Sequence, residues 1–240
     1  SNFYDDAAVQ PKPQLSFPEN APEQARHNFP QLRHYAQIPD SGPVPDSIAR
    51  KLIHGYHACV SYTDALIGQV LEELERLELA ENTLVILWGD HGWSLQEHGL
   101  WCKHSTFNVA MQTPLILKVP GKNGGKRISA LAEFVDIYPS LCELAGLALP
   151  AHLQGDSFVP LLENPEAEGK DAVFARWHSA DAVKTEQYLY TEWFDSTSNS
   201  VAKMLYDHRA DRAETVNIAE QAEHEDLVQQ LSQMIQAQRK

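Results

Sequence analysis

Asp90, His91 and Lys103 are the residues of this chain whose types and spacing best suit chemistry on an anion. Asp90 and His91 directly follow the apolar run 84–88 and lie between two glycines, which permit a tight turn with backbone close to a ligand. An aspartate offers a hard oxygen and a histidine a nitrogen, so the adjacent pair can share one metal ion. Lys103 follows thirteen residues after Asp90 in a loop of low charge, where its ammonium can be directed at an anion.

Each of these residues also has a simpler interpretation. An Asp-His pair in a turn can cap a nearby helix, and a lysine can be a solvated surface charge. Two ligands do not make a calcium site, because calcium takes about six to eight oxygen ligands. The nearby Glu97 and His98 could orient metal ligands from behind, but Glu97 also fits a hydrogen-bonded turn.

The elements around these residues predict an α/β body. The unbroken apolar run 84–88 predicts a strand covered on both faces, as in parallel sheets. Functional groups in open α/β sheets lie just beyond the carboxyl ends of strands, which is where Asp90 and His91 stand. Before this strand, apolar residues recur every three or four positions over residues 46–79 and predict a long amphipathic helix.

The rest of the chain predicts shorter elements and a smaller α+β part. Eight of the fourteen prolines fall within residues 1–45, which indicates an extended arm. The remaining predicted elements are a short helix over 105–111, a buried strand in "TPLILKVPG", a helix from Asp136 to the stop at Gly146, short strands in "AVFARW", "QYLYTEW" and "KMLYD", and a helical tail over 223–236.

Composition excludes several classes of protein. The chain has 240 residues, is 43% hydrophobic and carries a net charge of −14, which argues against broad binding of nucleic acid. A local cation cluster or a metal can still reverse the field inside a pocket. No apolar run approaches the roughly 20 residues of a membrane span. The spacing of Cys59, Cys102 and Cys142 suits neither a disulfide framework nor a zinc site, so we expect free thiols, with Cys59 and Cys142 buried in helices.

Four segments in sequence order resemble the C-terminal half of the sulfatase catalytic domain, in the alkaline-phosphatase-like superfamily. They are "GYHACVSYTDALIGQVLEEL", "DHGWSLQEHGLWCKHSTFNVAMQTPLILKVPG", "FVDIYPSLCELAGLALPAHLQGDSFVPLL" and "LYDHRADRAETVNIA". The resemblance is strongest to iduronate-2-sulfatase-like members. It implies part of a mixed α/β sheet flanked by helices, with a small C-terminal α+β subdomain. The implied division is an arm over 1–45, the C-terminal part of the catalytic domain over 46–150, and the subdomain over 151–240.

The resemblance also implies roles for individual residues. Asp90 and His91 match late ligands of the family's single calcium ion, and Lys103 matches the lysine that contacts the substrate sulfate and acts in catalysis. Trp93 and His104 fall where such enzymes shape the substrate pocket, and His98 stands in the shell behind the ligands. These roles make chemical sense, because sulfate-ester cleavage builds negative charge on oxygens that a cation and a lysine stabilise.

Two parts of the family's active site are missing from the sequence. Its nucleophile is a formylglycine made in a Cys-x-Pro/Ser-x-Arg motif, and none of the three cysteines stands in one. Its early calcium ligands are an Asp-Asp pair that ends a strand, but only four residues precede Asp5-Asp6, too few to build one. We therefore expect an N-terminal sulfatase portion outside this chain to complete the calcium site, and the chain alone to be inactive.

The resulting hypothesis is the C-terminal portion of a calcium-dependent sulfatase that hydrolyses sulfate esters, such as those of sulfated sugars. One alternative is a metal-dependent phosphodiesterase or phosphatase of the same superfamily, in which His98 and His104 would help hold a second metal. The other is a binding or assembly domain that kept the fold without catalysis. The resemblance implies a periplasmic, secreted or lysosomal location.

Overall fold

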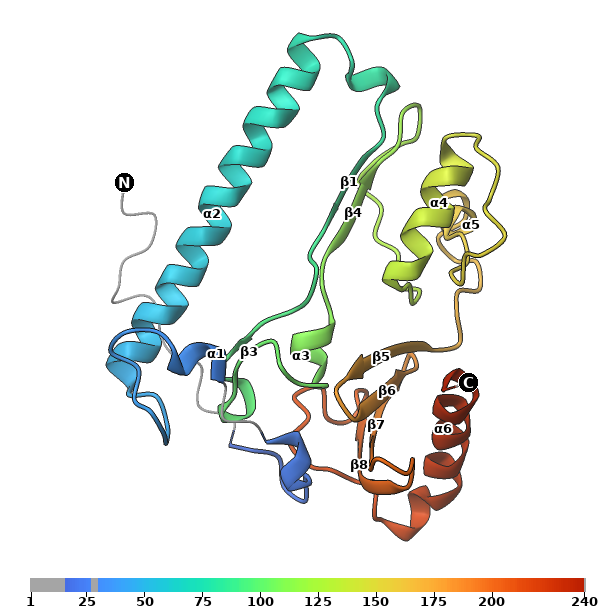
Figure 1. Ribbon diagram of the computed structural model, residues 1–240. Helices are drawn as coiled ribbons and strands as arrows, with labels where there is room; N and C mark the ends of the chain where they lie inside the picture. Colours follow the sequence, from blue (N-terminus) through green and yellow to red (C-terminus); the bar gives the residue numbers. More distant parts are fainter. Residues whose placement is uncertain (1–15, 27–29, 240) are drawn as a thin grey trace. The chain divides into compact units, whose positions relative to one another are not determined.

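The computed structural model describes residues 16–26 and 30–239, which divide into two compact units over 1–122 and 123–240 (Figure 1). Much of the predicted arm over 1–45 lies outside the described residues. Its described part contains two short helices, η1 (Glu23–Ala25) and α1 (Pro30–Arg33). The Arg33 guanidinium donates hydrogen bonds to the carbonyl oxygens of Pro39 and Gly42 and so holds the following turn.

The long helix α2 (Asp46–Arg76) confirms the helix predicted from the apolar periodicity, although it ends three residues early. Asp46 in its first turn and Arg76 in its last turn both complement the helix dipole. Much of its apolar stripe is not covered: Val60, Leu66 and Val70 are exposed.

Strands β1 (Val85–Trp88) and β4 (Leu115–Lys118) follow α2, and both were predicted. They pair with each other in antiparallel register, from Val85 opposite Lys118 to Trp88 opposite Leu115. In the described part of the chain the predicted cover on both faces is absent. Leu87, Trp88 and Ile116 are exposed, because β1 and β4 have only each other as strand neighbours among the described residues.

Between these two strands the chain makes a small ladder that was not predicted. Strands β2 (Ser94–Leu95) and β3 (Trp101–Cys102) pair in antiparallel register around η3 (Glu97–Gly99). The helix α3 (Asn108–Met111) follows and confirms the short helix predicted over 105–111. Two-residue strands are too short to show a period of two in the sequence. The side chains of Trp101, Cys102 and Phe107 fill the centre of the loop.

The second unit contains a four-stranded antiparallel sheet in the order β5-β6-β7-β8, and α6 packs on it (Figure 1). Three of the strands and the helix were predicted, whereas β6 was missed because it contains two alanines, which strands disfavour. The core between sheet and helix includes Val183, Tyr190, Leu205, Leu231 and Ile235. The bounds are β5 (Val173–Trp177), β6 (Ala180–Lys184), β7 (Tyr188–Phe194), β8 (Ser200–Asp207), η5 (Ala222–His224) and α6 (Glu225–Gln238).

The same unit begins with η4 (Phe134–Asp136), α4 (Ile137–Leu144) and α5 (Val159–Glu163). α4 follows Asp136 as predicted, but the helical segment is capped three residues earlier, at Glu133. Asp136 is the third residue of this capping box, and its carboxylate accepts a hydrogen bond from the backbone N–H of Glu133. The same carboxylate is buried against the ammonium of Lys170, with 2.7 Å between Nζ and Oδ1. The Asp136 carboxylate thus takes part in the helix cap and also binds Lys170, which lies 34 residues further along the chain.

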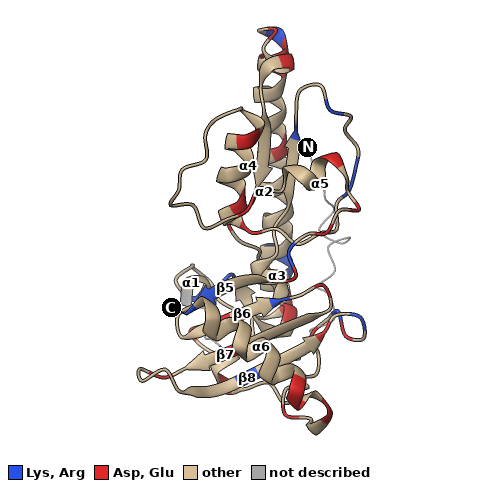
Figure 2. Cartoon of the chain, turned by 90° about the vertical axis from the view of Figure 1, so that its right-hand side faces the viewer, with Lys and Arg blue, Asp and Glu red and all other residues tan. Residues whose placement is uncertain are grey.

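Acidic residues occur in both units (Figure 2). Among the described residues no helix is both long and apolar enough to cross a bilayer. All three cysteines are free thiols, as predicted. Cys142 is buried as expected, but Cys59 is exposed on α2, so its predicted burial was wrong.

Candidate active site

The turn after β1 is held against α3 by backbone contacts. The N–H of Gly92 donates to the carbonyl of Ala110 at 2.8 Å, and the N–H of Gly89 to that of Pro114 at 3.4 Å. A Cβ on Gly92 would lie only 2.1 Å from the carbonyl oxygen of Val109. Position 92 therefore requires glycine because of this close approach.

His91 lies at the centre of the candidate site. Its Nδ1 is 2.8 Å from the carbonyl oxygen of Gly92, and its Nε2 is 2.9 Å from Nζ of Lys103. A carbonyl only accepts and an ammonium only donates, so these partners assign the proton to Nδ1 and the lone pair to Nε2. Asp90 Oδ2 lies 3.3 Å from the same Nε2. The structure thus brings together the three residues that the sequence singled out.

Lys103 reaches this point because the β2–β3 ladder turns the chain back on itself. Ser94 pairs with Cys102, so Lys103, the next residue, lies beside the turn that precedes Ser94. The loop takes left-handed backbone conformations at Gln96, His98 and Cys102, with φ of 90°, 57° and 69°, which are uncommon for residues other than glycine.

Glu97, His98 and Cys102 each have a clear place in this loop. The Glu97 carboxylate accepts a hydrogen bond from the N–H of Leu95 at 2.6 Å, as the turn interpretation predicts. The His98 ring is buried and stacks on Phe107, with 4.1 Å between centroids. Burial raises the pKa of the Cys102 thiol, while Lys103 and a backbone hydrogen bond from Leu32 act against the rise. A thiol with a raised pKa is a poor nucleophile, which fits a packing role for Cys102.

Aromatic rings flank the other side of His91. Trp93 stacks on His91 with 5.8 Å between centroids and an interplanar angle of 28°. Tyr56 of α2 stacks on Trp93 in turn, with 6.3 Å between centroids and an interplanar angle of 24°. Sequence reasoning missed Tyr56, because one ring in a helical apolar stripe carries no signal of its own.

His104 follows Lys103 in a tight turn, in which the N–H of Ser105 donates to the Lys103 carbonyl.

The fit of a divalent cation can be judged from the donor atoms. Asp90 Oδ2 and the His91 Nε2 lone pair converge, and the Asp90 side chain is 85% exposed and so open to an ion. A hard oxygen and an imidazole nitrogen fit part of a cation's shell. No group of three or more His, Cys, Asp or Glu side chains in the described part of the chain could hold a metal alone. Further ligands would have to come from outside the described residues.

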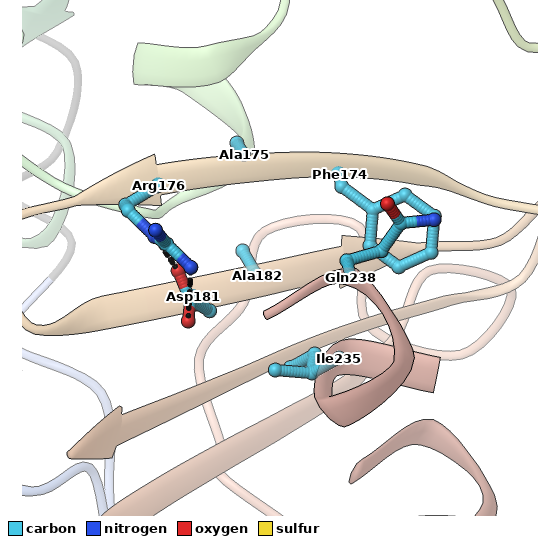
Figure 3. Close-up of a pocket in the computed structure, with 7 residues that line it drawn as sticks. All are labelled: Phe174, Ala175, Arg176, Asp181, Ala182, Ile235 and Gln238. Carbon is cyan, nitrogen blue, oxygen red and sulfur yellow. Dashed lines mark hydrogen bonds and ion pairs between the residues drawn. The ribbon is translucent and has the colours of Figure 1, made fainter. Parts of the chain in front are cut away.

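An open hollow of about 240 Å³ lies in the second unit between β5, β6 and α6 (Figure 3). Its polar centre is Asp181, which pairs with the guanidinium groups of Arg176 and Arg239. The apolar part of the lining is Phe174, Ala182 and Ile235. The charge of Asp181 is already compensated by Arg176 and Arg239, so the hollow offers no evident catalytic group. The turn after β1 is therefore the candidate active site.

Comparison with known proteins bears directly on this arrangement. The family described as Sulfatase matches residues 9–147, and the family described as N-sulphoglucosamine sulphohydrolase, C-terminal, matches residues 96–240. A protein from Formosa agariphila named Sulfatase is 33% identical over 78% of this chain and 36% of its own length. Iduronate 2-sulfatase of Mus musculus is 29% identical over 79% of this chain and 48% of its own.

A solved structure agrees with these relatives. It shows a protein in complex with its substrate D-glucosamine-2-N,6-O-disulfate, is 26% identical with a TM-score of 0.72, and covers 79% of this chain and 40% of that one. The architecture of helices and small sheets is part of an alkaline-phosphatase-like α/β fold. The chain belongs to the sulfatase family, as the sequence motifs predicted. It spans between about a third and a half of the length of the two curated relatives, and family members generally use a divalent metal ion.

Proposed function

We propose that this chain forms one side of the active site of a calcium-dependent sulfatase that hydrolyses sulfate esters of sugars. The observation that carries the proposal is the convergence of three side chains beyond the carboxyl end of β1. Lys103 Nζ lies 2.9 Å from His91 Nε2, which lies 3.3 Å from Asp90 Oδ2. A cationic donor and two candidate metal ligands therefore face the same point, which suits an anionic sulfuryl group.

The chemistry requires stabilisation of growing negative charge on the sulfuryl and leaving oxygens. An ammonium has three N–H donors, and once a cation takes the His91 Nε2 lone pair in place of Lys103, all three can be directed at sulfate oxygens. Asp90 and His91 would hold the cation, with the Nδ1 proton engaged by Gly92 so that Nε2 keeps its lone pair. A bound calcium ion would add Lewis-acid stabilisation of the sulfuryl oxygens.

The other side of the site, with the nucleophile and the remaining calcium ligands, is proposed to come from an N-terminal sulfatase portion. Two observations support this. The chain has no Cys-x-Pro/Ser-x-Arg motif. The β1–β4 ribbon also exposes Leu87, Trp88 and Ile116, an apolar surface that a neighbouring strand or helix would cover. Without that portion the chain is expected to be inactive.

Sulfated sugars are the proposed substrates because of what the relatives are named for. One is an iduronate 2-sulfatase, and the solved relative holds a disulfated glucosamine. Trp93 and His104, beside His91 and Lys103, are proposed to contact the sugar at the pocket mouth, and His98 to support the loop from behind. A periplasmic, secreted or lysosomal location is proposed on the same resemblance.

The test compares the full product of the gene with the isolated 240 residues. The full protein should hydrolyse a sulfated sugar or aryl sulfate far faster than the matching phosphate ester, lose activity on chelation and regain it with CaCl2. Lys103→Ala should lower kcat/KM by about 100-fold to 1,000-fold, whereas Lys126→Ala, at an exposed loop lysine, should not. Turnover by the isolated chain, preference for phosphate, or an unchanged Lys103→Ala variant would each refute the proposal.

A further inference from the structure

We infer that Tyr56 is a positioning residue that fixes the orientation of the His91 imidazole through Trp93. This inference rests on the proposed function, in which His91 holds a metal ion. It concerns a residue on α2 that never contacts the reacting atoms in this structure. The three rings form a series that runs from the long helix to the turn after β1.

The geometry of the series is direct. The Tyr56 and Trp93 centroids are 6.3 Å apart with an interplanar angle of 24°, and the Trp93 and His91 centroids are 5.8 Å apart with an angle of 28°. Each ring is therefore stacked on its neighbour in the series. Offset stacking at such distances is a preferred arrangement of aromatic rings and stabilises each pair beyond the burial of its surface.

Orientation matters at His91 because its two nitrogens have different tasks. Nδ1 donates to the Gly92 carbonyl, which sets the tautomer, and Nε2 points its lone pair at the Lys103 ammonium. A lone pair is directional, so rotation of the ring moves it away from the point that Lys103 and Asp90 share. Backbone hydrogen bonds hold the turn, but the Gly92 carbonyl contacts only the Nδ1 edge of the imidazole and does not by itself fix the tilt of the ring plane, which needs a reference outside the turn.

Tyr56 supplies that external reference. It lies in the interior of α2, where helical backbone restricts its χ1 angle, and α2 contacts β2 of the same unit. Trp93 immediately precedes β2 and has no helix of its own to hold its ring. The Tyr56 ring, which is held by α2, therefore restricts the orientation of the Trp93 ring, and the Trp93 ring restricts that of the His91 imidazole.

The test uses four variants of the full-length protein loaded with CaCl2. Tyr56→Leu removes the ring but keeps a good helix former, and Tyr56→Phe keeps the ring and loses only the hydroxyl. Tyr62→Leu is the matched control, the same exchange on the same helix at a side chain that is 67% exposed. His91→Gln serves to assign the His91 signals in NMR spectra of protein labelled with 13C-histidine.

Tyr56→Leu should lower kcat by about 5-fold to 10-fold with little change in KM, and should shift the His91 ring signals as Trp93 moves. Tyr56→Phe and Tyr62→Leu should leave both readouts as in the parent protein. Unchanged His91 signals in Tyr56→Leu, or equal losses in Tyr56→Leu and Tyr56→Phe, would overturn the inference.

The NMR measurement separates this inference from the proposed function. If the parent protein lacks sulfatase activity, the proposed function fails, and the His91 signals of the variants still decide whether Tyr56 sets the ring. If Lys103→Ala abolishes activity but Tyr56→Leu changes neither readout, the proposed function stands and the role of Tyr56 is refuted.

Discussion

Lys170 is the side chain that fastens the first part of the second unit. Its ammonium lies 2.7 Å from Glu133 Oε2 and 2.7 Å from Asp136 Oδ1. Burial lowers the pKa of Lys170, but hydrogen bonds and attraction to Asp136 and Glu133 outweigh it, so the pKa is raised. The stabilisation is therefore complete below the usual lysine pKa of 10.5 and is lost at more alkaline pH.

We predict that Lys170→Met destabilises the protein by about 3 kcal/mol, because it leaves two carboxylates in a partly buried place without their cation. Thermal unfolding of Lys170→Met should show the loss at pH 7 and a smaller difference from the parent protein in strong alkali. Lys126→Met, at an exposed loop lysine, is the control and should unfold like the parent. Equal melting temperatures for the two variants would contradict the prediction.

Asp195 is a second residue whose charge has a measurable consequence. Hydrogen bonds from the Thr197 hydroxyl and from the Asn199 backbone lower its pKa to about 2. A lowered carboxyl pKa stabilises the fold above the usual value of 3.8, and the stabilisation is lost as the pH falls toward 2.

Thr197→Ala is predicted to raise the Asp195 pKa toward 3.8, because the hydroxyl that lies 2.7 Å from its carboxylate is removed. NMR titration of the side-chain carboxyl carbon measures the change directly. Ser196→Ala alters a neighbouring hydroxyl in the same turn and should leave the titration where it was. A Thr197→Ala titration that coincides with the parent's would contradict the prediction and would show that the backbone donors and the Asn199 side-chain amide suffice to lower the pKa.

At the residue scale the sequence was informative where residue types are rare and their spacing is specific. Asp90, His91 and Lys103 were found in this way, and the structure brings them within contact distance. Tyr56 was not, because its contact with Trp93 depends on how α2 packs beside the turn. Cys59 was expected to be buried because it lies on an apolar stripe, but in the described part of the chain that stripe is mostly uncovered.

Among the elements, the turn after β1 depends on one glycine. A Cβ at Gly92 would meet the carbonyl oxygens of Val109 and Gln112 at 2.1 and 2.7 Å, both from backbone that cannot rotate away. We predict that Gly92→Ala either shifts α3 or displaces the turn, at a cost of about 2–3 kcal/mol. The melting temperature measured by differential scanning calorimetry and the kcat/KM of the full protein should both decrease.

The matched control for that substitution is Gly124→Ala. Gly124 has open space around its Cα and no positive φ, so alanine there should change neither the melting temperature nor kcat/KM. A Gly92→Ala variant with the stability and activity of the parent protein would mean that the close approach to Val109 is relieved without cost.

Element prediction succeeded where a pattern is long and failed where it is short. The 31 residues of α2 were predicted from their apolar periodicity, and β1 and β4 were predicted from their unbroken apolar runs. The β2–β3 ladder has two residues per strand and depends on left-handed backbone at Gln96 and Cys102, which residue type does not signal. The antiparallel pairing of β1 with β4 likewise reflects contacts between strands that periodicity does not specify.

On the scale of the whole molecule, the first unit is the less well covered of the two in its apolar elements. Ile116 of β4 is 58% exposed, and Leu87 and Trp88 of β1 are exposed as well. We predict that the isolated 240 residues self-associate in a concentration-dependent way, because large apolar surface and open strand edges favour contact between copies. Analytical ultracentrifugation measures this directly.

Ile116→Lys should reduce that association, since a charge on a strand face opposes stacking of one ribbon on another. Leu147→Lys, at an exposed residue after α4, provides the same charge change outside the ribbon and should have little effect. A monomeric isolated chain, or equal effects of the two substitutions, would show that the ribbon is not the contact surface.

The uncovered β1–β4 ribbon also bears on how such a protein can be used. Under the proposed division of the active site between two pieces, this ribbon would be the place to build a two-component reporter. Each piece would be inactive by itself. Fusing the pieces to two interacting proteins would then convert their encounter into the release of a coloured alcohol from an aryl sulfate.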